Sequence, residues 1–166
     1  MIVVGYQGIG KSTLAGRDYK YIDLESENFW IDGERADDWY KPYCKIAEHL
    51  SEQGYIVFVS SHEVVRQYLV ENSRELVVLV YPSIELKDAW IDKLEKRYIK
   101  SGLKKDYKAL TNAKYSYVEN IKELQESCIE YKLEIQKMDY DLEAMLIHWR
   151  NKIEKYWKGI DYESNN

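Results

Sequence analysis

The sequence predicts an α/β fold, a three-layer sandwich in which helices cover both faces of a five-stranded parallel sheet. Apolar runs of strand length alternate along the chain with segments whose apolar residues recur at helical spacing. Two of these runs, over residues 55–59 and 76–80, are uninterrupted, which is typical of strands buried on both faces. Because crossovers between parallel strands are right-handed, the helices come to lie on both faces of such a sheet.

The first half of the chain alternates strands with helices. The expected elements are strands over 1–4, 19–24 and 55–59, and helices over 12–18, over 38–54 and after Ser61. Pro42 fits the first turn of the second helix, where its missing N–H is not needed. Gly54 ends that helix, and Ser61 can cap the third. The polar segment before Asp38 contains Gly33 as a breaker and leaves little room for a large acceptor domain.

The second half continues the same alternation. The expected elements are strands over 76–80 and 131–138, and helices over 83–98, 105–127 and 141–157. Ser101 and Gly102 separate two of these helices. Residues 131–138 alternate apolar and polar side chains, which suits a strand at the edge of the sheet. The last residues, 164–166, are expected to fray.

A glycine-rich stretch lies between the first strand and the first helix and reads G-x-x-x-x-G-K-[ST], the phosphate-binding loop (P-loop) pattern. Its glycines allow backbone N–H groups to point at a polyphosphate. Lys11 brings a positive charge to the phosphates, the Ser12 hydroxyl can hold Mg²⁺, and the following helix N-terminus adds to the same field. The residues expected to contact the nucleotide are Gly5, Gln7, Gly8, Ile9, Gly10, Lys11, Ser12 and Thr13. The stretch predicts ATP or GTP binding; the alternative is an ordinary glycine-rich turn before a helix.

Composition limits the function classes. The chain has 166 residues, 45% of them hydrophobic, which suits one domain over 1–166 with a substantial core. A net charge of −5, with both signs interspersed, argues against general nucleic-acid binding. No apolar stretch reaches the length of a membrane span, and no basic leader precedes the first strand, so we expect a cytoplasmic protein without membrane contact. The oligomeric state is not readable.

Three places resemble the nucleoside monophosphate kinase group of P-loop kinases, including small kinases of phages and prophages. They are the glycine-rich loop, residues 80–86 followed by 93–97, and residues 133–143. In the group these are the phosphate loop, the fourth strand with the helix that enters the lid, and the last strand with the base-contacting loop. The resemblance implies the fold of P-loop-containing nucleoside triphosphate hydrolases, a strand order 2-3-1-4-5, and a helical lid over about 93–112.

The chain departs from the group in three ways. Lys93 stands where the group most often has arginine, so its contacts would lack the planar fork of a guanidinium. The third strand ends in Ser60 and Ser61, without the carboxylate of a conventional Walker B segment. No N-K-x-D motif is placed to read a base, which weighs against a GTPase.

Ligands of open α/β sheets bind at the carboxyl ends of the strands, so Gly5, Asp23, Ser60 and Tyr81 should face one crevice. Taken together with the resemblance, this placement predicts which residues act. The expected catalytic residues are Lys11, Asp23 and Arg97, and Lys93 and Arg97 are expected to bind the nucleotide. Asp23, Glu25, Ser60 and Arg66 are expected to bind the substrate, and Ser12 the metal. Each has a structural alternative. Arg97 and Lys93 can form a solvated helix end, Asp23 a polar strand end, and Arg66 a surface ion pair with Glu63 or Glu71.

The function expected is ATP- and Mg²⁺-dependent phosphoryl transfer to a nucleoside or deoxynucleoside monophosphate. Two other readings fit the same residues. One is a P-loop kinase acting on a different hydroxyl, such as that of a nucleoside, a sugar acid or a polynucleotide end. The other is a nucleotide-binding module without catalysis, which the missing Walker B carboxylate would suit. His62 is expected to be a helix-start residue rather than a base, and Met138 and Tyr140 flank the adenine or simply pack.

Overall fold

The computed structural model describes residues 1–30 and 34–163 of the chain, with side chains as far as residue 155. Gly33 and the tail over 164–166 lie outside this part, so the expectations for them stay predictions. The strands are β1 (Ile2–Gly5), β2 (Tyr21–Asp23), β3 (Ile56–Ser60), β4 (Val77–Pro82) and β5 (Tyr131–Ile135). The α-helices are α1 (Lys11–Ala15), α2 (Tyr40–Glu52), α3 (Glu63–Asn72), α4 (Lys87–Ser101), α5 (Lys104–Glu126) and α6 (Leu142–Glu163). Short 3₁₀ helices cover Ser26–Phe29 (η1) and Ile84–Leu86 (η2).

The five strands form one parallel sheet in the order β2-β3-β1-β4-β5, which confirms the predicted α/β class and strand order. β1 lies at the centre, and every side chain it contributes is buried. Its last residue, Gly5, pairs with Ser60 of β3 and with Val80 of β4. β1 and β3 therefore end side by side where the glycine-rich loop begins, and β4 continues two residues further, to Pro82.

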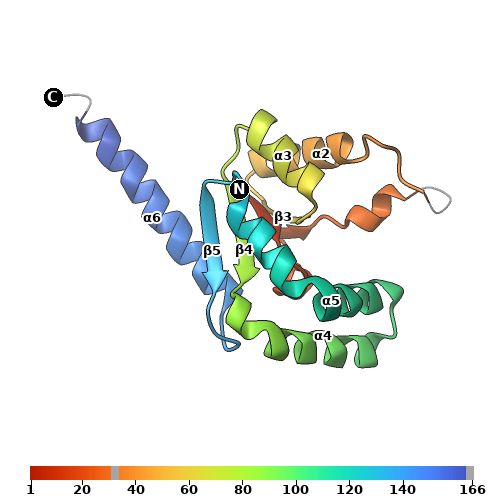
Figure 1. Ribbon diagram of the computed structural model, residues 1–166. Helices are drawn as coiled ribbons and strands as arrows, with labels where there is room; N and C mark the ends of the chain where they lie inside the picture. Colours follow the sequence, from red (N-terminus) through yellow and green to blue (C-terminus); the bar gives the residue numbers. More distant parts are fainter. Residues whose placement is uncertain (31–33, 164–166) are drawn as a thin grey trace.

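The helices pack around this sheet (Figure 1). α2 contacts β3 and lies against α3, while α5 contacts β4 and lies beside α4. α6 starts near the carboxyl end of β5, buries Leu142 and Leu146, and then runs away from the rest of the fold. Among the described residues, no helix is both long enough and apolar enough to cross a membrane.

Several predicted boundaries were wrong by a few residues. β2 has three residues, because Tyr19, expected to open it, is 90% exposed. β5 ends at Ile135, before the predicted 138, and α6 continues past the predicted end at 157. Ser61 does not cap α3; the N-cap is His62, and it makes no side-chain capping bond.

Candidate functional site

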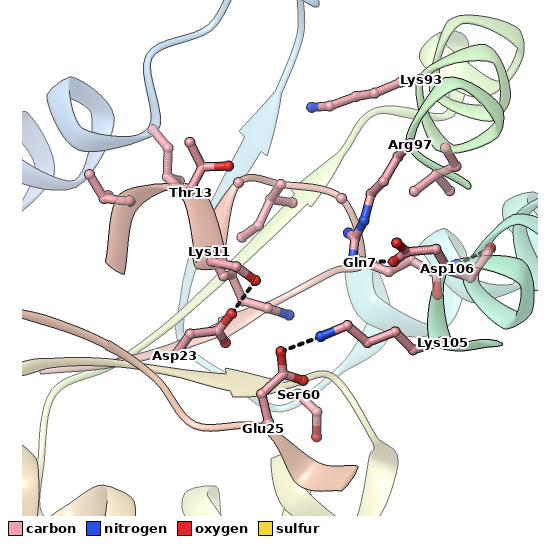
Figure 2. Close-up of a pocket in the computed structure, with 18 of the residues that line it drawn as sticks. Gln7, Lys11, Thr13, Asp23, Glu25, Ser60, Lys93, Arg97, Lys105 and Asp106 are labelled. Atoms are coloured by element: carbon pink, nitrogen blue, oxygen red, sulfur yellow. Dashed lines mark hydrogen bonds and ion pairs between the residues drawn. The ribbon is translucent and has the colours of Figure 1, made fainter. Parts of the chain in front are cut away.

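A cavity of about 930 Å³ opens at the carboxyl ends of the strands. The glycine-rich loop, α1, the end of β2, α4, the start of α5 and the β5–α6 connection all contribute to its lining (Figure 2). The predicted site residues that line it are Gln7, Gly8, Ile9, Gly10, Lys11, Ser12, Thr13, Asp23, Glu25, Ser60, Lys93 and Arg97. The prediction for Tyr81 was wrong, because that side chain is buried at 6% exposure and does not line the cavity.

The loop backbone has the conformation that its glycines were expected to allow. Gly8 and Gly10 have φ angles of 85° and 107°, where a side chain would be strained. A Cβ on Gly5 would lie 2.6 Å from Cδ1 of Ile9 and 2.9 Å from Cδ of Lys11. Ile9 is itself buried. The loop is therefore folded so tightly over the end of β1 that a methyl group on its first glycine would force the side chains of Ile9 and Lys11 to shift.

Lys11 turns back over this loop. Its Nζ donates a hydrogen bond of 2.8 Å to the carbonyl oxygen of Gly5. Burial lowers the pKa of Lys11, and the negative charges of Asp23 and Glu25 oppose that shift. A half-buried ammonium group with a neutral hydrogen-bond partner is poorly solvated, so an anion bound beside it in the cavity would be favoured.

Ser12 and Asp23 meet at the mouth of the cavity. The Ser12 hydroxyl donates a 2.6 Å hydrogen bond to a carboxylate oxygen of Asp23. Asp23 is the last residue of β2, the outer neighbour of the strand that ends in Ser60. A carboxylate is thus present beside the loop hydroxyl, although it comes from a different strand than the Walker B pattern would lead one to expect.

Hydroxyl and carboxylate oxygens are suitable ligands for Mg²⁺, which in nucleotide sites takes one or two protein ligands and completes its shell with phosphate and water. Within the described part of the chain, no group of three or more histidine, cysteine or acidic side chains could hold a metal alone. Ser12 and Asp23 therefore fit a metal that arrives with a nucleotide, and they do not form a free-standing metal centre.

Three cationic side chains face the cavity from α4 and α5, opposite Asp23 and Glu25 (Figure 2). Arg97 forms an ion pair with Asp106, which is 3% exposed. Lys105 donates a 2.9 Å bond to Glu25, and this contact raises the pKa of Lys105. The third cation, Lys93, has no carboxylate partner among the described residues.

Lys93 instead contacts aromatic groups. Its Nζ donates a 2.8 Å hydrogen bond to the Tyr140 hydroxyl and lies 4.4 Å from the ring centre of Trp90. Burial, with the nearby positive charge of Arg97, lowers the pKa of Lys93 to about 8. Its charge therefore changes in the pH range of ordinary assays.

The glycine-rich loop is tied to the surrounding elements by bonds that the sequence did not reveal. Gln7 donates from Nε2 to the Ala109 carbonyl of α5 at 2.9 Å and accepts at its own carbonyl from Trp90 of α4 at 3.0 Å. Tyr140 donates to the Ile9 carbonyl at 2.8 Å, and burial raises the pKa of this phenol to about 12, so it stays a donor. Met138, which was expected either to flank the adenine or simply to pack, lines the same cavity and is 37% exposed.

Arg66 does not lie in this cavity. It is 5% exposed; its Nε donates to the Ser61 carbonyl at 3.1 Å, and its guanidinium pairs with Glu123 of α5. The predicted role at an acceptor phosphate is therefore not supported, and the predicted alternative partners, Glu63 and Glu71, are also wrong. An arginine that pairs with a residue 57 positions away cannot be assigned from local spacing.

Known proteins add little to this picture. Neither the known protein families nor the curated proteins contain a match to the chain. Among solved structures it is similar to an uncharacterized protein from Eubacterium ventriosum ATCC 27560, at 14% sequence identity and a TM-score of 0.47. The similarity covers 91% of this chain and 97% of that one. At this level the similarity carries no functional information.

Proposed function

We propose that the chain is an ATP- and Mg²⁺-dependent phosphotransferase with the fold of P-loop-containing nucleoside triphosphate hydrolases. One observation carries the proposal. The Ser12 hydroxyl bonds to Asp23 beside the half-buried Lys11 ammonium, at the start of a helix that follows a glycine loop. Hydroxyl, carboxylate and ammonium groups in this arrangement suit a magnesium-bound polyphosphate.

Phosphoryl transfer requires alignment and positive charge more than covalent participation by the protein. In the proposed reaction, backbone N–H groups of the loop and Lys11 bind the donor phosphates, and Ser12 and Asp23 hold the metal. Bound Mg²⁺ would neutralise part of the phosphate charge. Arg97 and Lys105 face the same cavity from α4 and α5, so a small approach of these helices brings two more positive charges to the transferred group.

The acceptor expected from the sequence is a nucleoside or deoxynucleoside monophosphate. The placement of Arg66 favours a second acceptor class, compounds that receive the phosphoryl group on a hydroxyl rather than on a phosphate. That arginine was the cation expected to bind an acceptor phosphate, and it is paired with Glu123 outside the cavity.

The test is a coupled assay of ADP release with Mg-ATP. All ribo- and deoxyribonucleoside monophosphates are compared with the corresponding nucleosides, with simple sugars and sugar acids, and with a reaction without acceptor. ADP release that depends on one acceptor supports the proposal. Tight ATP binding without ADP release on any acceptor would contradict it and indicate a nucleotide-binding module.

Lys11→Ala should lower turnover by several orders of magnitude, because the charge that meets the transferred phosphoryl group is lost. The matched control is Lys132→Ala on β5, where the lysine side chain bonds, within the described residues, only to the Gln125 carbonyl. Circular dichroism should show both variants folded. Unchanged turnover in Lys11→Ala would exclude the proposed role.

Arg97→Ala should reduce kcat by more than it raises the KM for ATP, since the arginine is proposed to act on the transition state. Its partner Asp106 stays buried in this variant, so thermal unfolding is measured alongside the kinetics. A change in KM alone would remove the transition-state role and leave only nucleotide binding.

A further inference from the structure

A second cavity, of about 400 Å³, lies beside the first. The end of β3, the start of α3 and the middle of α5 line it, and it shares Gln7, Lys11 and Ser60 with the nucleotide cavity. The two cavities therefore adjoin at Lys11. In the proposed function this is the side chain that contacts the phosphate to be transferred, so a compound in the second cavity would lie next to it.

The charges lining the second cavity do not suit a phosphate. Among the described residues, Lys11 is its only lysine or arginine, and the donor phosphates would already occupy that ammonium group. Two carboxylates, Glu63 and Glu123, also line it. Arg66 is held behind Glu123 and does not reach the lining.

His62 does not change this balance. It lines the cavity, and its Nδ1 lies 2.8 Å from the Ser60 hydroxyl oxygen. Burial, together with the positive charges of Arg35 and Lys11, lowers the pKa of His62 below its ordinary value. The ring is therefore neutral at pH 7 and offers hydrogen-bonding groups rather than a positive charge.

Most of the remaining side chains that line the second cavity are neutral hydrogen-bonding groups. Asn112 and Asn120 of α5 face the cavity, and the amide nitrogen of Asn120 donates a 2.8 Å bond to the side-chain oxygen of Asn112. Ser116, midway between them, has non-helical φ and ψ angles of −135° and 20°. That bond uses one polar atom of each amide, so a second atom on each remains for other contacts. With Ser60 and Glu63, the cavity presents donors and acceptors suited to hydroxyl groups.

We propose that the second cavity binds the phosphoryl acceptor, and that this acceptor is an uncharged compound with several hydroxyl groups, of the size of a nucleoside or a sugar. The inference rests on the proposed phosphotransferase function. An acceptor hydroxyl oxygen forms a bond to the γ-phosphorus of ATP, the bond from that phosphorus to the β,γ-bridging oxygen breaks, and ADP leaves. The hydroxyl proton is released, so the products are ADP, the phosphorylated acceptor and one proton.

The experiment compares matched pairs of acceptors in the ADP-release assay. Each nucleoside is paired with its 5′-monophosphate, and glucose and ribose with their phosphates. We expect kcat/KM to be at least tenfold higher for the uncharged member of the productive pair. A preference for the phosphorylated member would overturn the inference and leave the phosphotransferase function intact.

The location is tested with Asn112→Ala, on an exposed helix position where no core contact is lost. Because the acceptor would lose a hydrogen bond, its KM should rise about tenfold while the Kd for ATP stays unchanged. The matched control is Asn72→Ala, which removes an exposed asparagine at the end of α3.

Two further outcomes are decisive. If neither Asn112→Ala nor Asn120→Ala changes the KM of the uncharged acceptor from its value in the unaltered protein, the acceptor binds elsewhere, which overturns the inference. If no acceptor of either kind supports ADP release although ATP binds, the proposed function fails, and the inference fails with it.

Discussion

At the scale of single residues, Gly5 shows why the glycine-rich loop requires this residue type at its start. A methyl group there would meet the side chains of Ile9 and Lys11 at 2.6 and 2.9 Å. Both side chains have a role, since Ile9 fills the core beneath the loop and Lys11 carries the charge. The φ angle of Gly5 is not in the positive range seen at Gly8 and Gly10, so its backbone does not require a glycine. The glycine is needed instead because the neighbouring side chains pack so closely against it.

Gly5→Ala should weaken ATP binding at least tenfold, because Ile9 and Lys11 must both shift to accommodate the methyl group. The matched control is Gly54→Ala, at a position where a Cβ meets nothing within 4 Å but φ is +94°. That variant should lose about 1 kcal/mol of stability through backbone strain and keep its ATP affinity. Titration calorimetry and thermal unfolding of both variants check the prediction; equal ATP affinities would contradict it.

Lys93 should make ATP binding depend on pH. Its pKa is lowered to about 8, so its positive charge is present below that pH and is lost as the pH rises through it. If the ammonium contacts phosphate, the Kd for Mg-ATP should rise several-fold between pH 7 and 9. Lys93→Met should bind more weakly at pH 7 with a smaller pH slope, and Lys93→Arg should keep its affinity at pH 9. Identical slopes in all three proteins would exclude the contact.

At the scale of elements, α4 and α5 are held together by two ion pairs that differ in how far their side chains are buried. Arg97 and Asp106 pair where the carboxylate is 3% exposed, and Ser101 donates a further hydrogen bond to Asp106. Lys114 and Glu95 pair between the same helices, but both are nearly half exposed. Water screens the second pair far more than the first.

Asp106→Asn should destabilise the protein by about 2 kcal/mol, because the ion pair between Arg97 and the buried carboxylate is lost. That loss lowers Tm by roughly 4–8 °C for a chain of this length. Glu95→Gln, which breaks only the exposed pair, should cost less than about 1 kcal/mol. Thermal unfolding compares them, and hydrogen exchange should show faster opening of α4 and α5 in Asp106→Asn alone. Equal losses of stability would mean that burial of the pair has little influence.

The elements differ in how well their sequence predicts them. β3 and β4 were located to within one or two residues, because strands buried on both faces leave uninterrupted apolar runs. β2 is an edge strand of only three residues, so its apolar pattern is short. The prediction therefore extended it to include Tyr19, which is exposed. Asp106 was missed because a charged residue in a helix is usually solvated, and the partner that buries it lies on another helix.

At the scale of the whole molecule, the candidate site joins segments far apart in sequence, so a ligand in it should stabilise the fold. Mg-ATP at 100 times its Kd should add about 2.7 kcal/mol to the free energy of unfolding. That corresponds to a rise in Tm of roughly 5–10 °C. ATP with EDTA should give a smaller rise, and Asp23→Asn should abolish the difference between the two conditions. A Tm insensitive to ATP would contradict nucleotide binding.

The central position of β1 also has a consequence for how the protein is made. β1 is synthesised before both of the strands, β3 and β4, that flank it in the finished sheet. These partners end at Ser60 and Pro82, so synthesis must reach Pro82 before both sides of β1 can be paired. Until then at least one edge of β1 stays unpaired, and a fragment ending before β4 would expose that edge to chaperones and to pairing with other nascent chains.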